Sequence, residues 1–151
     1  MKTEQSKLLY AELTEKIIGV YYDVYNELGH GFLESVYSNA MGRALAQAGL
    51  AVQREVSVPV YLRGWDVGHF KADLVVNGCI LIELKAVQAL DRSHEAQVIN
   101  YLRATELEVG LLFNFGGSKP QFRRIVLENA SKKIRVHPRE SAVGGSSEAC
   151  E

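Results

Sequence analysis

Residues 80–86 read ILIELKA and place two charged side chains inside an apolar run. A run this rich in isoleucine and leucine is typical of a strand buried in a sheet, where ionised groups are costly unless partners compensate them. Side chains alternate along a strand, so Glu83 and Lys85 share one face and the surrounding apolar residues share the other. The strand is therefore predicted to present a functional pair of charges, with a strand-surface ion pair as the simpler alternative.

The apolar spacing predicts two helices followed by a sheet. Apolar residues recur at helical intervals over 10–28 and 37–48, and a glycine follows each run. The period then changes to two, which is typical of strands. The predicted strands cover 52–62, 65–76, 79–87, 109–115 and 122–127, with a helix over 91–105 capped by Asp91 or Ser93. This order, ααβββαββ, indicates an α/β fold, and Pro59 predicts that the first strand lies at an edge.

Composition fits one ordinary soluble domain: 151 residues, 47% hydrophobic, with a formal net charge of -1. We expect a single domain over 1–130 and a basic, then low-complexity, largely disordered tail over 131–151. No apolar run is long enough to cross a membrane and no secretory signal is apparent, so a cytoplasmic protein is expected. Cys79 and Cys150 are too few for a disulfide framework or a cysteine-rich metal site.

Charge is distributed unevenly along the chain. A dedicated nucleic-acid-binding protein usually carries a clear basic excess, which this chain lacks overall. Between residues 119 and 139, however, the sequence contains seven basic residues and a single acid, Glu128. A solvated surface with a basic tail explains this asymmetry at least as well as a binding surface does.

Asn77-Gly78 lies between two apolar runs, which is a strong signal for a β-hairpin. A strict two-residue loop would put Asp73 and Glu83 on opposite faces of the sheet. We predict instead a three-residue loop over 76–78 with Gly78 in a left-handed bulge, or an equivalent bulge inside a strand.

The predicted bulge pairs Lys71 with Glu83 and gives the sheet two unlike faces. One face is apolar throughout. The other carries a polar strip made of His69, Lys71, Asp73, Glu83 and Lys85.

Two helices supply further candidates. Glu34 lies at the N-terminal end of a helix face that should pack inward, although acids are common in first turns for simple electrostatic reasons. Gln97 and Tyr101 are four residues apart and share a helix face with His94 one turn earlier. By itself that pair is typical of an ordinary half-buried helix.

Two or three carboxylates beside a lysine match the preferences of Mg²⁺ or Mn²⁺ for hard oxygen ligands, retained waters and a substrate phosphate. Such an ion polarises a scissile phosphate, and Lys85 could orient the attacking water or stabilise charge on the phosphate oxygens. A purely structural ion network remains the alternative for the whole set.

Asp73 followed by Glu83-Leu84-Lys85 across a hairpin resembles the PD-(D/E)xK nuclease superfamily, whose fold is restriction-endonuclease-like, with a mixed central sheet of about five strands flanked by helices. The spacing Gln97-xxx-Tyr101 is similar to the Gln-xxx-Tyr motif of the branch that contains lambda exonuclease and RecB-type nucleases. GFLESVY at 31–37 matches the GxxExxVY signature of a family of small proteins assigned to that superfamily. The resemblance covers roughly residues 8–127.

By that similarity, three acids would hold Mg²⁺ or Mn²⁺, a lysine would be catalytic, and a helix pair would brace the site or contact the nucleic-acid backbone. The three acids are Glu34, Asp73 and Glu83, and the catalytic lysine is Lys85. The helix pair is Gln97 and Tyr101. The resemblance implies hydrolysis of phosphodiester bonds in DNA, with RNA the less favoured substrate. Ala72 stands where the superfamily's name has proline, which contributes backbone shape and no chemistry.

Two functional hypotheses follow. The first is a metal-dependent nuclease; because the core leaves little chain for target recognition, specificity would need a homodimer or a partner protein, or would be absent. The second is a catalytically silent module of the same fold that binds nucleic acid or a protein. The intact acidic set favours the first, and the near-neutral net charge favours the second.

Overall fold

The structure is a computed structural model that describes residues 10–132. Its helices are α2 (Ala11–Leu28), α3 (Glu34–Gln47) and α4 (Arg92–Arg103), with a short 3-10 helix, η1 (Asn129–Ser131). Its strands are β1 (Val52–Leu62), β2 (Trp65–Val76), β3 (Ile80–Lys85), β4 (Val109–Asn114) and β5 (Gln121–Val126). The predicted order ααβββαββ is confirmed. The predicted tail, from residue 133 on and including Cys150, lies outside the described residues.

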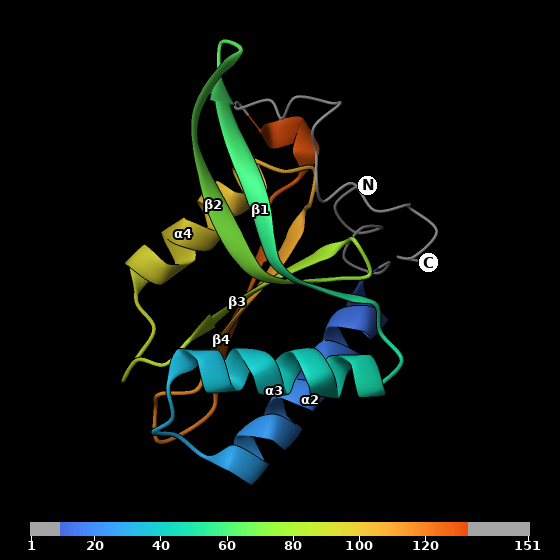
Figure 1. The fold of residues 1–151 in the computed structure, drawn as a ribbon, viewed down its shortest axis with the longest axis vertical. Helices are drawn as coiled ribbons and strands as arrows, with labels where there is room; N and C mark the ends of the chain where they lie inside the picture. The colour runs from blue at the N-terminus through green and yellow to red at the C-terminus, as the bar shows by residue number, and fades with distance from the viewer. Residues whose placement is uncertain (1–9, 133–151) are drawn as a thin grey trace.

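The five strands form one mixed sheet in the order β1-β2-β3-β4-β5 (Figure 1). Only β3 and β4 pair in parallel, because α4 makes the crossover between them, and the other neighbours are antiparallel. β1 is an edge strand, as Pro59 predicts. Within residues 10–132, no helix combines the length and hydropathy that a membrane crossing requires.

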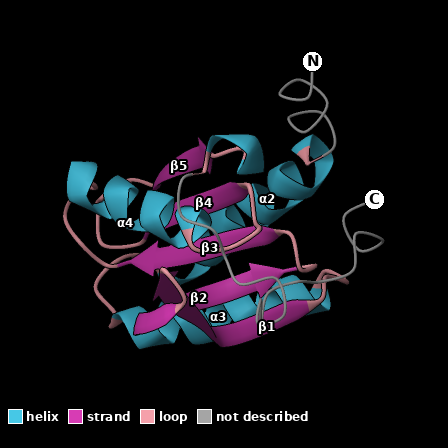
Figure 2. Ribbon diagram, turned by 90° about the horizontal axis from the view of Figure 1, so that it is seen from above, coloured by secondary structure: helices cyan, strands magenta, loops and turns pink. Residues whose placement is uncertain are grey.

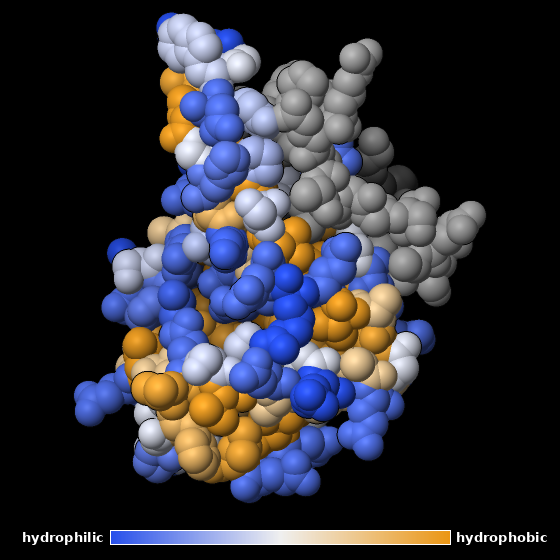
Figure 3. All heavy atoms as spheres, in the orientation of Figure 1, coloured by the Kyte–Doolittle hydropathy of each residue, from blue (hydrophilic) through white to orange (hydrophobic). Residues whose placement is uncertain are grey.

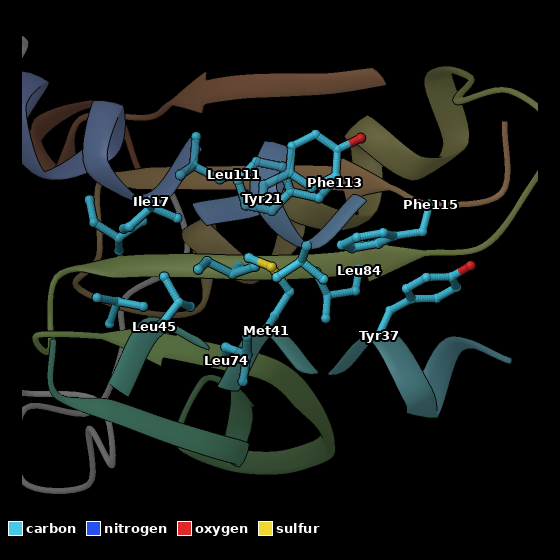
Figure 4. Close-up of a cluster of buried hydrophobic side chains, with 14 of the residues drawn as sticks. Ile17, Tyr21, Tyr37, Met41, Leu45, Leu74, Leu84, Leu111, Phe113 and Phe115 are labelled. Carbon is cyan, nitrogen blue, oxygen red and sulfur yellow. The ribbon is translucent and has the colours of Figure 1, made fainter. Parts of the chain in front are cut away.

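Helices cover both faces of the sheet. α2 and α3 pack on one face and α4 on the other (Figure 2). On the first face Tyr21 stacks on Phe113 with ring centroids 4.4 Å apart, and Tyr37 stacks on Phe115 at 4.3 Å (Figure 4). On the second face Leu81 joins the cluster beneath α4. β3 is consequently buried on both sides, which explains its nearly unbroken apolar sequence.

The hairpin between β2 and β3 has a three-residue loop, but not at the predicted position. Asn77 and Gly78 both adopt left-handed conformations, with φ of 53° and 68°. Val76 pairs with Ile80, so the loop is 77–79 rather than 76–78, and the predicted register is wrong by two residues. The cause is a long-range contact: Asn77 exchanges hydrogen bonds with Ala51, its N–H donating to the Ala51 carbonyl at 2.8 Å and its Oδ1 accepting the Ala51 N–H at 2.9 Å.

Because the loop still has an odd number of residues, the β2 and β3 side chains near the turn lie on the faces of the sheet that were predicted for them. The last paired residues are Leu74 and Ile82, and the same register places Asp73 opposite Glu83 instead of Lys71. Beyond that point β2 no longer pairs with β3. The hairpin therefore has a three-residue loop as predicted, although in a different register, and this register aligns the two carboxylates directly.

β1 and β2 continue their own pairing past β3, as far as Leu62 opposite Trp65. We call the segment 56–71 the arm; it extends away from the body of the sheet (Figure 1). The predicted continuous polar strip is wrong here. Its members His69 and Lys71 are exposed on the arm, and His69 pairs with Asp66 at 3.4 Å.

The apolar row predicted along β2 is interrupted for the same reason. Leu74 packs in the cluster under α2 and α3, whereas Ala72 and Phe70 pack in the cluster under α4. The strand therefore changes its orientation relative to the sheet around Asp73. That change separates Asp73 from the charged residues of the arm.

Candidate functional site

Asp73 and Glu83 lie where β2 leaves β3. The Leu84 N–H donates to Asp73 Oδ2 at 2.8 Å, and the Asp73 N–H donates to Glu83 Oε1 at 3.2 Å. A buried backbone N–H left without an acceptor is costly, and the two side chains supply the acceptors that the ladder no longer provides. The end of the β2–β3 pairing thus fixes both carboxylates beside each other.

In this pair Glu83 is buried and Asp73 is half-buried, and the pair is electrostatically unfavourable as two anions. Glu83 is 3% exposed. Burial raises its pKa to about 8, with the negative charge of Asp73 adding to the shift and Lys85 opposing it. Burial also raises the pKa of Asp73. A side-chain hydrogen bond joins the two groups, and their raised pKa values mean that a second negative charge on the pair is disfavoured.

Glu34 reaches the same place from the first turn of α3. Partial desolvation raises the pKa of its carboxyl group, which Lys85 lowers and Asp73 raises. The backbone N–H of Ala86, directly after β3, donates a hydrogen bond to it. Three acids, from a helix start and two strands, therefore lie within electrostatic reach of the half-buried Lys85 at the end of β3.

α4 brings Gln97 and Tyr101 to the other side of the acids. Gln97 Nε2 donates to the Tyr101 hydroxyl oxygen at 2.7 Å. The Tyr101 ring stacks on Phe70 with centroids 3.8 Å apart and planes 8° from parallel. Burial raises the pKa of Tyr101, and the charge of Glu83 raises it further. The capping box of Asp91 fixes the start of the helix, as the sequence predicts.

Comparison with protein families identifies the fold that carries this arrangement. A family model of the PD-(D/E)XK nuclease superfamily matches residues 11–125. The chain belongs to this superfamily. The match runs from α2 into β5 and contains every residue of the site. Comparison with curated proteins finds no match, and neither does comparison with solved structures.

The donor chemistry of this PD-(D/E)XK site suits a hard divalent cation, although no closed cage is present. Within residues 10–132, no group of three or more His, Cys, Asp or Glu side chains is arranged to hold a metal ion. Mg²⁺ is usually bound through only one or two protein carboxylates, with water and substrate phosphate as the remaining ligands. Asp73 and Glu83 each commit one oxygen to a backbone N–H. A bound cation would offset the burial and the mutual repulsion that raise the pKa values of these two carboxyl groups.

Asn114 holds the chain beside the site, a role that the sequence analysis does not predict. It lies opposite Lys85 in the parallel pairing and is fully buried. Its Oδ1 accepts the N–H groups of Val87 and Gly116, both at 3.0 Å, and its Nδ2 donates to the Val87 carbonyl at 2.8 Å. Asn114 thereby holds the chain that follows Lys85. The available signal was a lone amide inside the apolar run VGLLFNF.

Proposed function

We propose that this PD-(D/E)XK protein is a metal-dependent nuclease that hydrolyses phosphodiester bonds of DNA, with RNA as the less favoured substrate. The observation that carries the proposal is the gathering of Glu34, Asp73 and Glu83 around Lys85, with all three acids at raised pKa. Perturbed carboxylates that converge with a specific charge partner are characteristic of functional sites. The spacing of Glu34 within GFLESVY further supports membership of the GxxExxVY group.

The acids and the lysine take different roles in this proposal. Glu34, Asp73 and Glu83 would hold Mg²⁺ or Mn²⁺ through carboxylate oxygens, one or two of them directly and the rest through retained waters. When bound, the ion supplies Lewis acidity towards the scissile phosphate and the attacking water. Lys85 orients that water or stabilises the negative charge that develops on the phosphate oxygens. The hydrogen bonds of Asn114 keep the backbone after Lys85 in place during the reaction.

Gln97 and Tyr101 position the substrate from α4, as in the Gln-xxx-Tyr branch. Because the Tyr101 oxygen accepts a hydrogen bond from Gln97, its own proton is free to donate to a phosphate oxygen. Stacking on Phe70 limits the rotation of the ring. The pair would therefore hold the nucleic-acid backbone against the acids.

Cleavage of single- and double-stranded DNA in Mg²⁺, Mn²⁺ or EDTA tests the proposal. Glu83→Gln and Lys85→Ala should abolish the metal-dependent activity, and Glu15→Gln on the exposed side of α2 serves as a matched control. Wild type and site variants that cleave equally at trace level would identify the activity as contamination.

A silent module that binds nucleic acid or a protein is the alternative, and the net charge of -1 favours it. Such a module would bind DNA or a partner without turnover in any metal. An affinity for DNA that does not fall with salt would point further towards a protein partner.

A further inference from the structure

Two large apolar side chains stand exposed directly before the first acid of the site. Phe32 is 49% exposed and Leu33 is 76% exposed, and the next residue is Glu34. We call Phe32 and Leu33 the apolar lip. Figure 3 shows hydrophobic atoms gathered at the lower left, over the end of the molecule where Figure 1 places the start of α3.

The lip is held in place by the core. The hydroxyl group of Tyr37 accepts the Phe32 N–H at 3.1 Å and donates to the Gly29 carbonyl at 2.6 Å. The rings of Phe32 and Tyr37 meet edge to face at 6.1 Å, and Tyr37 itself is fully buried against Phe115. The lip therefore belongs to an anchored loop, because the buried Tyr37 ties the loop's backbone to the core.

Local stability does not account for Leu33. It is the N-cap residue of α3, where its side chain makes no capping hydrogen bond. Serine, threonine, asparagine and aspartate stabilise a helix at this position, and leucine does not. Leu33 thus neither caps the helix nor buries its side chain within the described residues, so its apolar surface is available to a partner.

We propose that the apolar lip binds an unpaired nucleobase next to the phosphate held at the acids, so that the site favours single strands or frayed ends over internal duplex. This inference rests on the proposed function, because it takes the phosphate position from Glu34 and Lys85. Leu33 directly precedes Glu34, so its backbone lies beside the residue that would help to hold the phosphate. A nucleotide beside that phosphate therefore lies within reach of Leu33.

The choice of an unpaired base follows from what a duplex exposes. Inside a duplex the apolar faces of the bases stack on each other, and side chains reach only base edges and the backbone. Single strands offer those faces to aromatic and apolar side chains. Phe32 and Leu33 present apolar surface and no hydrogen-bonding side-chain group, so they suit a base face and not a base edge.

Binding in EDTA tests the lip without hydrolysis. The probes are a fluorescent single-stranded oligonucleotide, the duplex of the same sequence, and the single strand with base-free sugars. The variants are Leu33→Ser and Phe32→Ala, with Leu62→Ser on the arm as a matched control because Leu62 is 53% exposed. Wild type should bind the single strand more tightly than the duplex. Each lip variant should weaken single-strand binding about tenfold, and the difference should vanish on the base-free strand.

Thermal unfolding separates a binding role from a structural one. Leu33→Ser introduces a favoured N-cap, so its melting temperature should equal or exceed that of wild type while its affinity falls. Phe32→Ala also removes the ring contact with Tyr37, so Leu33→Ser carries the decision. A lower melting temperature of Leu33→Ser together with unchanged affinity would make the lip structural and overturn the inference.

The remaining outcomes distinguish this inference from the proposed function. If Leu33→Ser binds all three probes like wild type while Glu83→Gln abolishes cleavage, the lip inference is wrong and the nuclease proposal stands. If no DNA is cleaved but single-strand binding depends on the lip, the nuclease proposal fails and the lip stands. If Leu33→Ser abolishes self-association in sedimentation and leaves DNA binding intact, the lip is a contact between copies and the inference is overturned.

Discussion

β2 passes through two different environments within a few residues. The carboxylate of Asp73 accepts a hydrogen bond from the Leu84 N–H and lies against Glu83, and its pKa is raised. On the arm, Asp66 pairs with His69, and the two side chains are about half exposed, at 48% and 54%. An acid of the same chemical type is thus desolvated at one end of the strand and hydrated at the other.

The difference is one of dielectric environment and not of residue type. An exposed ion pair such as that of the arm contributes about 0–1 kcal/mol, because water screens it. Carboxylates crowded in a buried position repel each other strongly, and they either keep a proton or attract a cation. The end of β3 is therefore the part of the molecule where buried charges could take part in a reaction, whereas the Asp66–His69 pair of the arm is exposed to solvent.

Replacing one acid in each region should give the largest difference in the rate of DNA cleavage. We expect Glu83→Gln to lower the rate of metal-dependent DNA cleavage by about 10²–10³-fold or more, because the charge that organises the reaction is lost. Asp66→Asn on the arm should leave the rate within about twofold, since surface substitutions change little. Initial rates in Mg²⁺ measure both. Equal losses in the two variants would remove the distinction between the regions.

Divalent ions should stabilise one region selectively. At pH 8, Mn²⁺ at one hundred times its dissociation constant should raise the free energy of unfolding by about 2.7 kcal/mol. The gain should be smaller at pH 5, because the raised pKa values of Asp73 and Glu83 mean that protons compete with the ion for their oxygens. Thermal unfolding with and without Mn²⁺ measures it. Glu83→Gln should lose the gain and Asp66→Asn should keep it; an unchanged melting temperature in wild type would favour a structural ion network.

The metal-free protein should lose stability as the pH rises. The pKa of Glu83 is about 8 in the folded state, against an ordinary value of 4.5 in the unfolded chain. Between these values the folded state binds more protons than the unfolded state, so the free energy of unfolding falls with increasing pH, by about 1.4 kcal/mol per pH unit for one proton. Denaturant titration in EDTA from pH 4.5 to 8 measures the slope. Glu83→Gln should flatten it, whereas Asp66→Asn should not.

The smallest effect is expected at the tip of the arm. Trp65 is 60% exposed, so Trp65→Ala should change the free energy of unfolding by no more than about 0.5 kcal/mol. Urea denaturation followed by circular dichroism measures this, because the variant removes the chain's single tryptophan. A much larger loss would mean that the arm packs as part of the body of the protein.

Much of this fold could be predicted from local patterns. Helical spacing and strand alternation depend on neighbours in sequence, so the element order and the shared face of Glu83 and Lys85 follow without tertiary information. The capping role of Asp91 and the left-handed Gly78 are equally local. Candidate residues on separate elements, such as Glu34 and Gln97, could be proposed from their helix faces, and the resemblance to a nuclease family joined them into one site.

The errors all arise from long-range contacts. The hairpin loop is displaced because Asn77 is tied to Ala51, far away in the sequence. The polar strip fails because β2 leaves β3 at Asp73 and because α4 covers the face expected to be polar. Asn114 was overlooked because its task, holding the chain after Lys85, is visible only once β3 and β4 are paired.

The sequence by itself determined which residues could carry charge on a buried strand, since alternation along a strand is a matter of covalent geometry. Only the tertiary structure decided that Asp73 stands opposite Glu83 and that Glu34 reaches Lys85 from another element. It also decided that Phe32 and Leu33 stay exposed beside that site, because Tyr37 ties their loop to the core. Burial and convergence depend on distant parts of the chain meeting, and no local pattern records those meetings.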